Sequence, residues 1–150
     1  GNYETSYSVM AVKYEWHYLY TRAGIKGEAL LEEGVKDTYN FGPILIKDGQ
    51  AQPAWSETAK YYPELAVGMV KPGIYVLLVT DTGSYAGLNH WDLVNIFNSY
   101  GCQYAYNLDG GGSATLYYNG QVMNKLINNY EDHVGIFCIL QIDVLTMKSI

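Results

Sequence analysis

The sequence predicts an α+β fold, in which one mixed β-sheet of seven to nine strands carries two main helices within a single domain. Hydrophobic residues make up 49% of the 150-residue chain and charged residues 16%, so the chain can bury one substantial core. Tyrosine and glycine occur 16 times each, and aromatic rings suit the half-buried surface of a sheet. Short apolar runs between turn residues supply the strands, and two stretches have the composition of helices.

The first elements are expected to be a β-hairpin, formed by residues 7–14 and 16–20, whose apolar positions alternate or run together. The stretch K-G-E-A-L-L-E-E-G then predicts a helix that ends at Gly34, because glycine readily adopts the left-handed backbone of a helix stop. Residues 44–49 are typical of a strand that runs into an Asp-Gly turn. The polar segment 50–63 is expected to be a long surface loop.

Two strands should follow, L-A-V-G-M-V and I-Y-V-L-L-V-T-D, joined by a tight K-P-G turn. The second is nearly all apolar, which predicts a central strand that is buried on both faces. Three further strands are expected in the last third of the chain, from Y-A-Y-N-L-D, T-L-Y-Y-N-G and V-G-I-F-C-I-L-Q-I.

The clearest helix lies in N-H-W-D-L-V-N-I-F-N-S-Y-G. Asn89 is placed to cap its N-terminus, with an aspartate three residues later to favour the helix start. Trp91, Val94 and Phe97 recur at three-residue spacing and predict one apolar face, and Gly101 supplies the stop.

Composition argues against several classes of protein. The net charge is −6 with nine basic residues, whereas binding to a nucleic-acid backbone needs clustered lysine and arginine. No apolar run approaches the roughly 20 residues that span a bilayer, and the polar start G-N-Y-E-T-S is not a signal peptide. Cys102 and Cys138 do not form a C-x-x-C pair, which argues against a zinc or dithiol site. Buried free thiols are expected, with a disulfide as the alternative.

The glycine loop, N-L-D-G-G-G-S at residues 107–113, is the main candidate for chemistry. It lacks the lysine and the following helix of a nucleotide phosphate loop. Successive glycines can turn backbone N–H groups into a concave anion site. A carboxylate at Asp109 can act as acid, base or nucleophile, and Ser113 can donate a hydrogen bond to a phosphate or a sugar hydroxyl. The alternative is a flexible turn between two strands.

N-L-D-G-G-G-S-A-T-L, with N-G six residues after Ser113, resembles the signature of the phosphodiester glycosidase family. F-G-P-I-L-I-K-D-G at 41–49 is similar to a second block of that family, and V-L-L-V-T-D-T-G-S-Y-A-G-L-N-H-W-D-L at 76–93 is similar to a third. Blocks of the family, in its bacterial form, follow in order over about residues 25–140. Several blocks in the right order are far more specific than one glycine run.

This resemblance implies hydrolysis of the bond between a sugar's anomeric carbon and a phosphate, with a small-molecule or glycan phosphodiester as substrate. It implies catalytic carboxylates at Asp109 and Asp81. It also favours a secreted or cell-envelope protein and gives no oligomeric state. The substrate-binding residues that it implies are Asn107, Gly110, Gly111, Gly112, Ser113, Ser84, Gly87 and His133.

The chain departs from the family at several positions. Glu64 stands where the family has an arginine, and Asp81 is followed by Thr82-Gly83, so a second arginine is missing. His133 is a candidate substitute beside Asp132, and the domain, residues 1–150, is expected to lack the family's upstream segment. An alternative is therefore a non-catalytic member that binds a glycan or another small ligand at the same loop, or a related hydrolase of altered substrate. No cofactor is predicted, although clustered carboxylates would suit a divalent cation.

Overall fold

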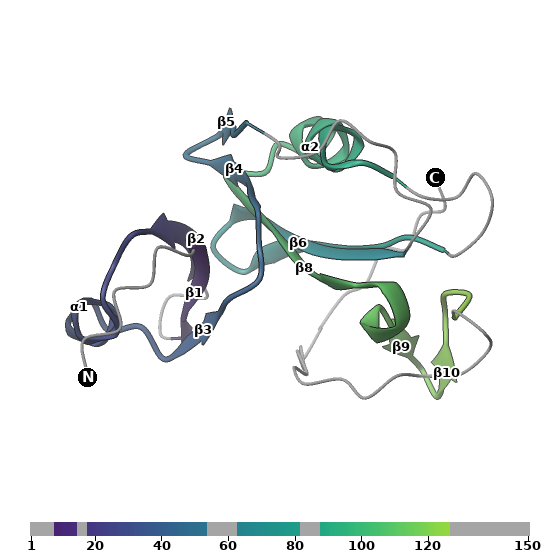
Figure 1. Cartoon of the computed structure of the whole chain (residues 1–150), viewed down its shortest axis with the longest axis horizontal. Coiled ribbons are helices and arrows are strands. Elements are labelled where there is room, and N and C mark those ends of the chain that lie inside the picture. The colour runs from purple at the N-terminus through teal and green to yellow at the C-terminus, as the bar shows by residue number, and fades with distance from the viewer. Residues whose placement is uncertain (1–7, 15–17, 54–62, 82–87, 127–150) are drawn as a thin grey trace.

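The computed structural model describes residues 8–14, 18–53, 63–81 and 88–126. It confirms the α+β class: strands predominate, and two α-helices accompany them (Figure 1). The described strands form three sheets, of five, three and two strands, rather than one sheet, and every described pairing is antiparallel.

The three-stranded sheet contains β1 (Ser8–Lys13), β2 (Tyr18–Ala23) and β3 (Asp37–Tyr39), in the order β2-β1-β3. The pairing of β1 with β2 confirms the predicted N-terminal hairpin. Helix α1 (Gly27–Glu32) follows β2, and Gly34 ends this turn with φ +78°, as predicted.

The five-stranded sheet has the order β5-β4-β8-β6-β7. Its strands are β4 (Ile44–Lys47), β5 (Gln50–Ala51), β6 (Glu64–Lys71), β7 (Ile74–Val79) and β8 (Tyr104–Gly110). Strand β8 therefore lies between β4 and β6, and in Figure 1 it crosses the middle of the molecule.

The Asp-Gly turn after β4 is confirmed, with φ +51° at Asp48 and +72° at Gly49. The residues after it, Gln50 and Ala51, pair with β4 and form β5, so the predicted loop begins later than residue 50. The hairpin extends because backbone pairing does not require apolar side chains. Residues 54–62 of that loop lie outside the described residues.

The prediction that β7 is buried on both faces is wrong, and within the described part of the sheet β7 is not central. Among the described strands β7 lies at the edge of its sheet, and Ile74 and Leu77 are 47% and 37% exposed. The well-buried central strands are β6 and β8, which carry the polar side chains of Glu64 and Asn107. A continuous apolar run shows that a strand has apolar contacts, but it does not show which strands flank it.

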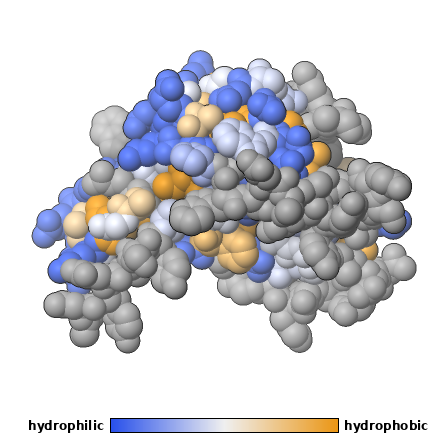
Figure 2. Space-filling view, turned by 45° about the horizontal axis from the view of Figure 1, so that its top comes forward, coloured by the Kyte–Doolittle hydropathy of each residue, from blue (hydrophilic) through white to orange (hydrophobic). Residues whose placement is uncertain are grey.

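Helix α2 (His90–Ser99) begins with a capping box, in which Asn89 and Asp92 exchange side-chain to backbone hydrogen bonds of 3.0 Å. Val94 and Phe97 are buried as predicted, but Trp91 is 40% exposed. The buried residues follow the i, i+3, i+4, i+7 spacing from His90, which turns Trp91 away from the sheet. Figure 2 shows a mainly hydrophilic described surface at the top of the view, with small hydrophobic areas between.

The core has layers, with α1, the three-stranded sheet, the five-stranded sheet and α2 in that order. Along β1, Val9 and Ala11 pack with α1, whereas Met10 packs with the residues of β6 and β8. On the other face of the five-stranded sheet, α2 packs over Ala66 and Ala105. A strand with apolar residues on both faces favours this stacking of sheets over one continuous sheet.

The two-stranded sheet is the short hairpin of β9 (Tyr117–Tyr118) and β10 (Gln121–Val122). Asn119 and Gly120 form its turn with positive φ angles of 49° and 84°. The predicted strand V-G-I-F-C-I-L-Q-I lies outside the described residues. Within the described residues, no helix has the length and apolar character to cross a membrane.

Candidate functional site

The glycine loop lies at the end of β8, where a short 3₁₀ turn (Gly111–Ser113) follows the strand. Gly110 is needed for space, because a Cβ on it would lie 2.7 Å from the carbonyl oxygen of Pro63. Gly111 is needed for its conformation, since its φ is +62°, and its N–H donates to the Pro63 oxygen at 2.8 Å. The sequence D-G-G-G therefore builds a fixed turn that is held against the start of β6.

Asp109 is half-buried at the end of β8. One carboxylate oxygen, Oδ1, accepts a hydrogen bond of 2.8 Å from the N–H of Gly110. No lysine or arginine of the described residues forms an ion pair with this carboxylate. The backbone therefore fixes the orientation of this carboxylate.

Asn107 joins the glycine loop to the F-G-P segment. Its backbone N–H donates to the carbonyl of Pro43, its carbonyl accepts from the N–H of Gly42, and its side-chain Nδ2 donates to the carbonyl of Gly42 at 3.2 Å. The Gly42–Pro43 peptide bond is cis. Asn107 is buried, and its Oδ1 has no hydrogen-bond partner among the described residues. Its observed contacts are those of a residue that positions the loop.

Glu64 also lies at the glycine loop, although it is not among the site residues that the sequence predicts. It is 6% exposed and pairs with Gly110 across the β6–β8 ladder. Its Oε2 accepts a 3.4 Å hydrogen bond from Asn107 Nδ2 and lies 3.1 Å from the Cβ position of Gly110. Hydrogen bonds between its backbone and Thr80 fix the strand there. A carboxylate thus lies directly against the glycine loop.

Asp81 follows β7 and is exposed. Its Oδ1 accepts a hydrogen bond of 2.7 Å from the backbone N–H of Lys125, beyond the β9–β10 hairpin. Asn124, which is buried, holds the base of that hairpin by bonding the backbone of Ala114 and Leu116. Asp81 therefore anchors the segment that follows the glycine loop.

Of the remaining predicted site residues, some lie within the described part of the chain and others lie outside it. Ser113 ends the 3₁₀ turn and is half-buried. The predicted residues Ser84, Gly87 and His133, and Asp132 beside the last, lie outside the described residues. Within the described residues, no three His, Cys, Asp or Glu side chains form a metal-binding group.

Cys102 is free and buried, as expected, while Cys138 lies outside the described residues. Burial raises the pKa of the Cys102 thiol to about 11, so the thiol is protonated at neutral pH. It packs in the core between β6 and α2 and has no part in the site.

The model of the phosphodiester glycosidase family matches residues 6–137 of this chain. The chain belongs to the phosphodiester glycosidase family. The glycine loop and the F-G-P segment, which are separate blocks of the sequence, meet in space through Asn107.

The relatives that this chain matches are longer than the chain itself. It is 27% identical over 136 residues to the SPbeta prophage-derived uncharacterized protein YomE of Bacillus subtilis strain 168, covering 87% of this chain and 20% of YomE. It shares its fold with the zebrafish N-acetylglucosamine-1-phosphodiester alpha-N-acetylglucosaminidase catalytic domain, which is auto-inhibited by a pro-peptide. That match has a TM-score of 0.62 at 20% identity and covers 79% of this chain and 44% of the zebrafish chain.

A hypothetical protein from Synechocystis has the same fold, with a TM-score of 0.53 and 18% identity, over 82% of this chain and 32% of that chain. The chain therefore spans about a fifth of the length of its Bacillus relative and less than half of each solved chain.

Proposed function

We propose that this chain is a phosphodiester glycosidase-like hydrolase that cleaves a sugar from a sugar-1-phosphodiester. The observation that carries the proposal is the Asp109 carboxylate. It is oriented by the N–H of Gly110 at the end of a buried strand, beside a turn built from glycine. A carboxylate held in a fixed orientation can attack an anomeric carbon or transfer a proton there.

The residues of the glycine loop have different roles in this proposal. The N–H groups of Gly110 and Gly111 already donate to Asp109 and to Pro63. Binding of the phosphate oxygens therefore falls to the Gly112 amide and the Ser113 hydroxyl. Asp109 acts at the anomeric centre, and Asp81 supports the site by holding the backbone of Lys125.

Glu64 favours a second candidate function, a family member that binds a neutral glycan at this loop without hydrolysis. Its carboxylate lies against Gly110, at a position where the resemblance to the family implies an arginine. A negative charge at this place repels a phosphodiester and does not repel a neutral sugar. The two functions therefore differ in whether an anionic ligand is accepted.

The direct test of the enzyme is the Asp109→Asn variant, assayed on p-nitrophenyl phosphodiesters of several sugars. Turnover should fall about 100-fold or more, because the amide cannot act as base or nucleophile. The matched control is Asp37→Asn on β3, in the other sheet, which should keep full turnover with an unchanged far-UV spectrum.

Assays of the unmodified protein distinguish the two candidate functions. Release of sugar from a phosphodiester supports the hydrolase. Saturable heat of binding with a neutral glycan, but no product from any phosphodiester in the panel, supports the binding module and excludes the hydrolase.

A further inference from the structure

A pocket of about 260 Å³ lies at the opposite end of β8 from the glycine loop. Its walls include Tyr18 of β2, Asp48 of the β4–β5 turn and Tyr104 at the start of β8. Strand β8 spans Tyr104–Gly110, so at about 3.3 Å per residue the pocket is roughly 20 Å from the glycine loop. The pocket is therefore separate from the site described above, and what it binds does not depend on the proposed hydrolase.

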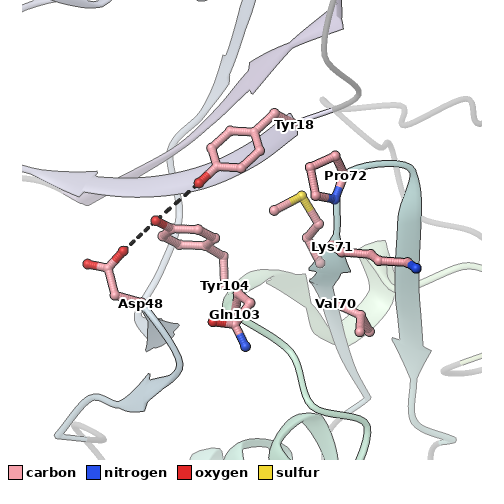
Figure 3. A pocket seen from close by; sticks show the side chains of 8 residues that line it. Tyr18, Asp48, Val70, Lys71, Pro72, Gln103 and Tyr104 are labelled. Carbon is pink, nitrogen blue, oxygen red and sulfur yellow. Dashed lines mark hydrogen bonds between the residues drawn. The ribbon is translucent and has the colours of Figure 1, made fainter.

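A chain of hydrogen bonds along one wall uses both tyrosine protons (Figure 3). The Tyr18 hydroxyl donates to the Tyr104 hydroxyl at 3.3 Å, and the Tyr104 hydroxyl donates to Asp48 Oδ1. An ionised carboxylate only accepts, which fixes the direction of both bonds. Burial and the bond to Asp48 raise the pKa of Tyr104, so this hydroxyl stays protonated. The wall therefore offers oxygen acceptors and a negative charge, but no free hydroxyl donor.

The basic and amide side chains at the pocket are directed elsewhere. In Figure 3 the Lys71 side chain extends away from the two tyrosines and from Asp48. The side-chain amide of Gln103 donates to the carbonyl oxygen of Gly101 at 3.4 Å. No lysine or arginine of the described ranges forms an ion pair with Asp48. Its charge is thus not neutralised by contact with a described cation.

A row of aromatic rings leads from the three-stranded sheet to the pocket. The ring centroids of Tyr20 and Tyr18 are 5.9 Å apart, and those of Tyr18 and Tyr104 are 5.8 Å apart, edge to face. At the Tyr20 end, the Lys13 ammonium lies 5.5 Å from the ring centroid, a cation–π contact. In the described part of the chain, no such cation lies over the rings of Tyr18 and Tyr104. The pocket end of the row can therefore attract an ammonium group that the described chain does not supply.

We propose that this pocket binds the ammonium group of a small alkylamine. An ammonium group carries positive charge and only donates hydrogen bonds, which matches a wall of acceptors that includes one carboxylate. The tyrosine rings attract the same charge, and Met69 gives the alkyl chain an apolar contact. An anion would be repelled by Asp48, and a neutral hydroxyl would lack a donor for its own lone pairs. A pocket below the roughly 300 Å³ at which drug-sized pockets begin fits one such small group.

The test is a two-dimensional ¹H–¹⁵N NMR titration of the full chain with n-butylammonium chloride. Saturable shifts are expected at the amides of Asp48, Gln103 and Tyr104, with a Kd on the order of several millimolar, as for ligands of a few atoms. The controls n-butanol and sodium butyrate have a similar alkyl chain without the positive charge. They are titrated at the same ionic strength and should give no such shifts.

Two variants separate the charge from the hydroxyl groups. Asp48→Asn keeps the turn, because asparagine also adopts the positive φ of 51° found there, and should weaken binding about two- to five-fold. Tyr18→Phe should weaken binding less, because the ring and the carboxylate both remain. Glu32→Gln on α1 is the charge-matched control and should leave the Kd unchanged.

Two further amines identify the source of the ammonium group. Tighter binding of Nα-acetyl-lysine methylamide than of n-butylammonium indicates a lysine of a peptide, and tighter binding of glucosamine hydrochloride indicates an amino sugar. If n-butylammonium binds more tightly than both, the ligand is a free alkylamine.

The proposal is wrong if n-butylammonium leaves the pocket amides unshifted or if n-butanol shifts them equally. Equal weakening by Asp48→Asn and Glu32→Gln would also contradict it, because it would show general attraction of cations to an acidic chain. An Asp109→Asn protein should bind n-butylammonium as the unmodified protein does. Loss of turnover and loss of ammonium binding are therefore independent results.

Discussion

At the scale of single residues, two neighbouring glycines of the glycine loop are required for different reasons. Gly110 leaves space for the carbonyl of Pro63, and Gly111 adopts a left-handed backbone in open surroundings. The N–H of Gly110 also orients Asp109. Substitution of the first should therefore disturb the proposed chemistry, and substitution of the second should mainly cost stability.

The Gly110→Ala and Gly111→Ala variants test this difference. Gly111→Ala should lower the free energy of unfolding by about 1 kcal/mol, the cost of left-handed backbone for alanine. Gly110→Ala should cost about 1–3 kcal/mol, since backbone must move, and should displace Asp109 and reduce turnover further. Urea denaturation and the phosphodiester assay measure both, and a larger loss of turnover in Gly111→Ala would contradict the assignment.

Cys102 gives a prediction for pH. Burial disfavours the thiolate and raises its pKa from 9.0, the value of a thiol in water, to about 11 in the folded protein. A raised folded pKa stabilises the protein fully below pH 9, and this contribution is lost as pH rises towards 11. The stability advantage over Cys102→Ala should shrink by about 2 kcal/mol across that window. Urea midpoints at pH 7.5, 9, 10 and 11 measure it, and a constant difference would contradict it.

At the scale of elements, α2 was predictable because its signals are local. Asn89, Asp92 and Gly101 lie within one helix and its caps, and each does what the sequence indicates. The position of β7 was not predictable, since edge and central strands can share one apolar pattern. The stacking of two sheets also depends on contacts between residues far apart in the chain.

In the candidate site, too, the sequence predicts local features but not contacts between residues far apart in the chain. The glycine loop and Asp109 could be found from sequence because they form one contiguous motif. The contact between Asn107 and Gly42 joins residues 65 positions apart, and the place of Glu64 against Gly110 depends on strand register. Pairing between strands decides such contacts, and no local pattern encodes it.

The packing of α2 on its sheet gives a prediction at Gly68 of β6. A Cβ there would lie 2.6 Å from Phe97 and 2.8 Å from the Cys102 sulfur, so Gly68→Ala should destabilise the fold by about 1–3 kcal/mol. Phe97→Leu alone should also cost stability, because it shrinks a buried side chain.

The double variant tests the mechanism, because the smaller side chain makes room for the added methyl group. Gly68→Ala with Phe97→Leu should be less destabilising than the sum of the two single changes, by at least about 0.5 kcal/mol. Strict additivity in urea denaturation would show that the close contact does not set the distance between α2 and the sheet.

At the scale of the whole molecule, β8 connects two ends with different properties. One end carries the glycine loop with Asp109 and Glu64, and the other carries the pocket with Asp48 and Lys71. The chain as a whole has a net charge of −6. A phosphodiester that approaches the glycine loop therefore meets both a local carboxylate and a repulsive overall field.

This field should be visible in the salt dependence of turnover. The Debye length falls from about 30 Å at 0.01 M salt to about 8 Å at 0.15 M, which screens repulsion between the chain and an anionic substrate. The kcat/KM for a sugar phosphodiester should therefore rise about two- to five-fold over that range. The inhibition constant of the neutral free sugar is the control and should stay constant.

The Glu64→Gln variant should raise kcat/KM most at low salt, and kcat/KM of this variant should depend less on salt than that of the unmodified protein. A kcat/KM that falls as salt is added would show that attraction by cations governs the approach of the substrate, and would contradict charge repulsion at Glu64.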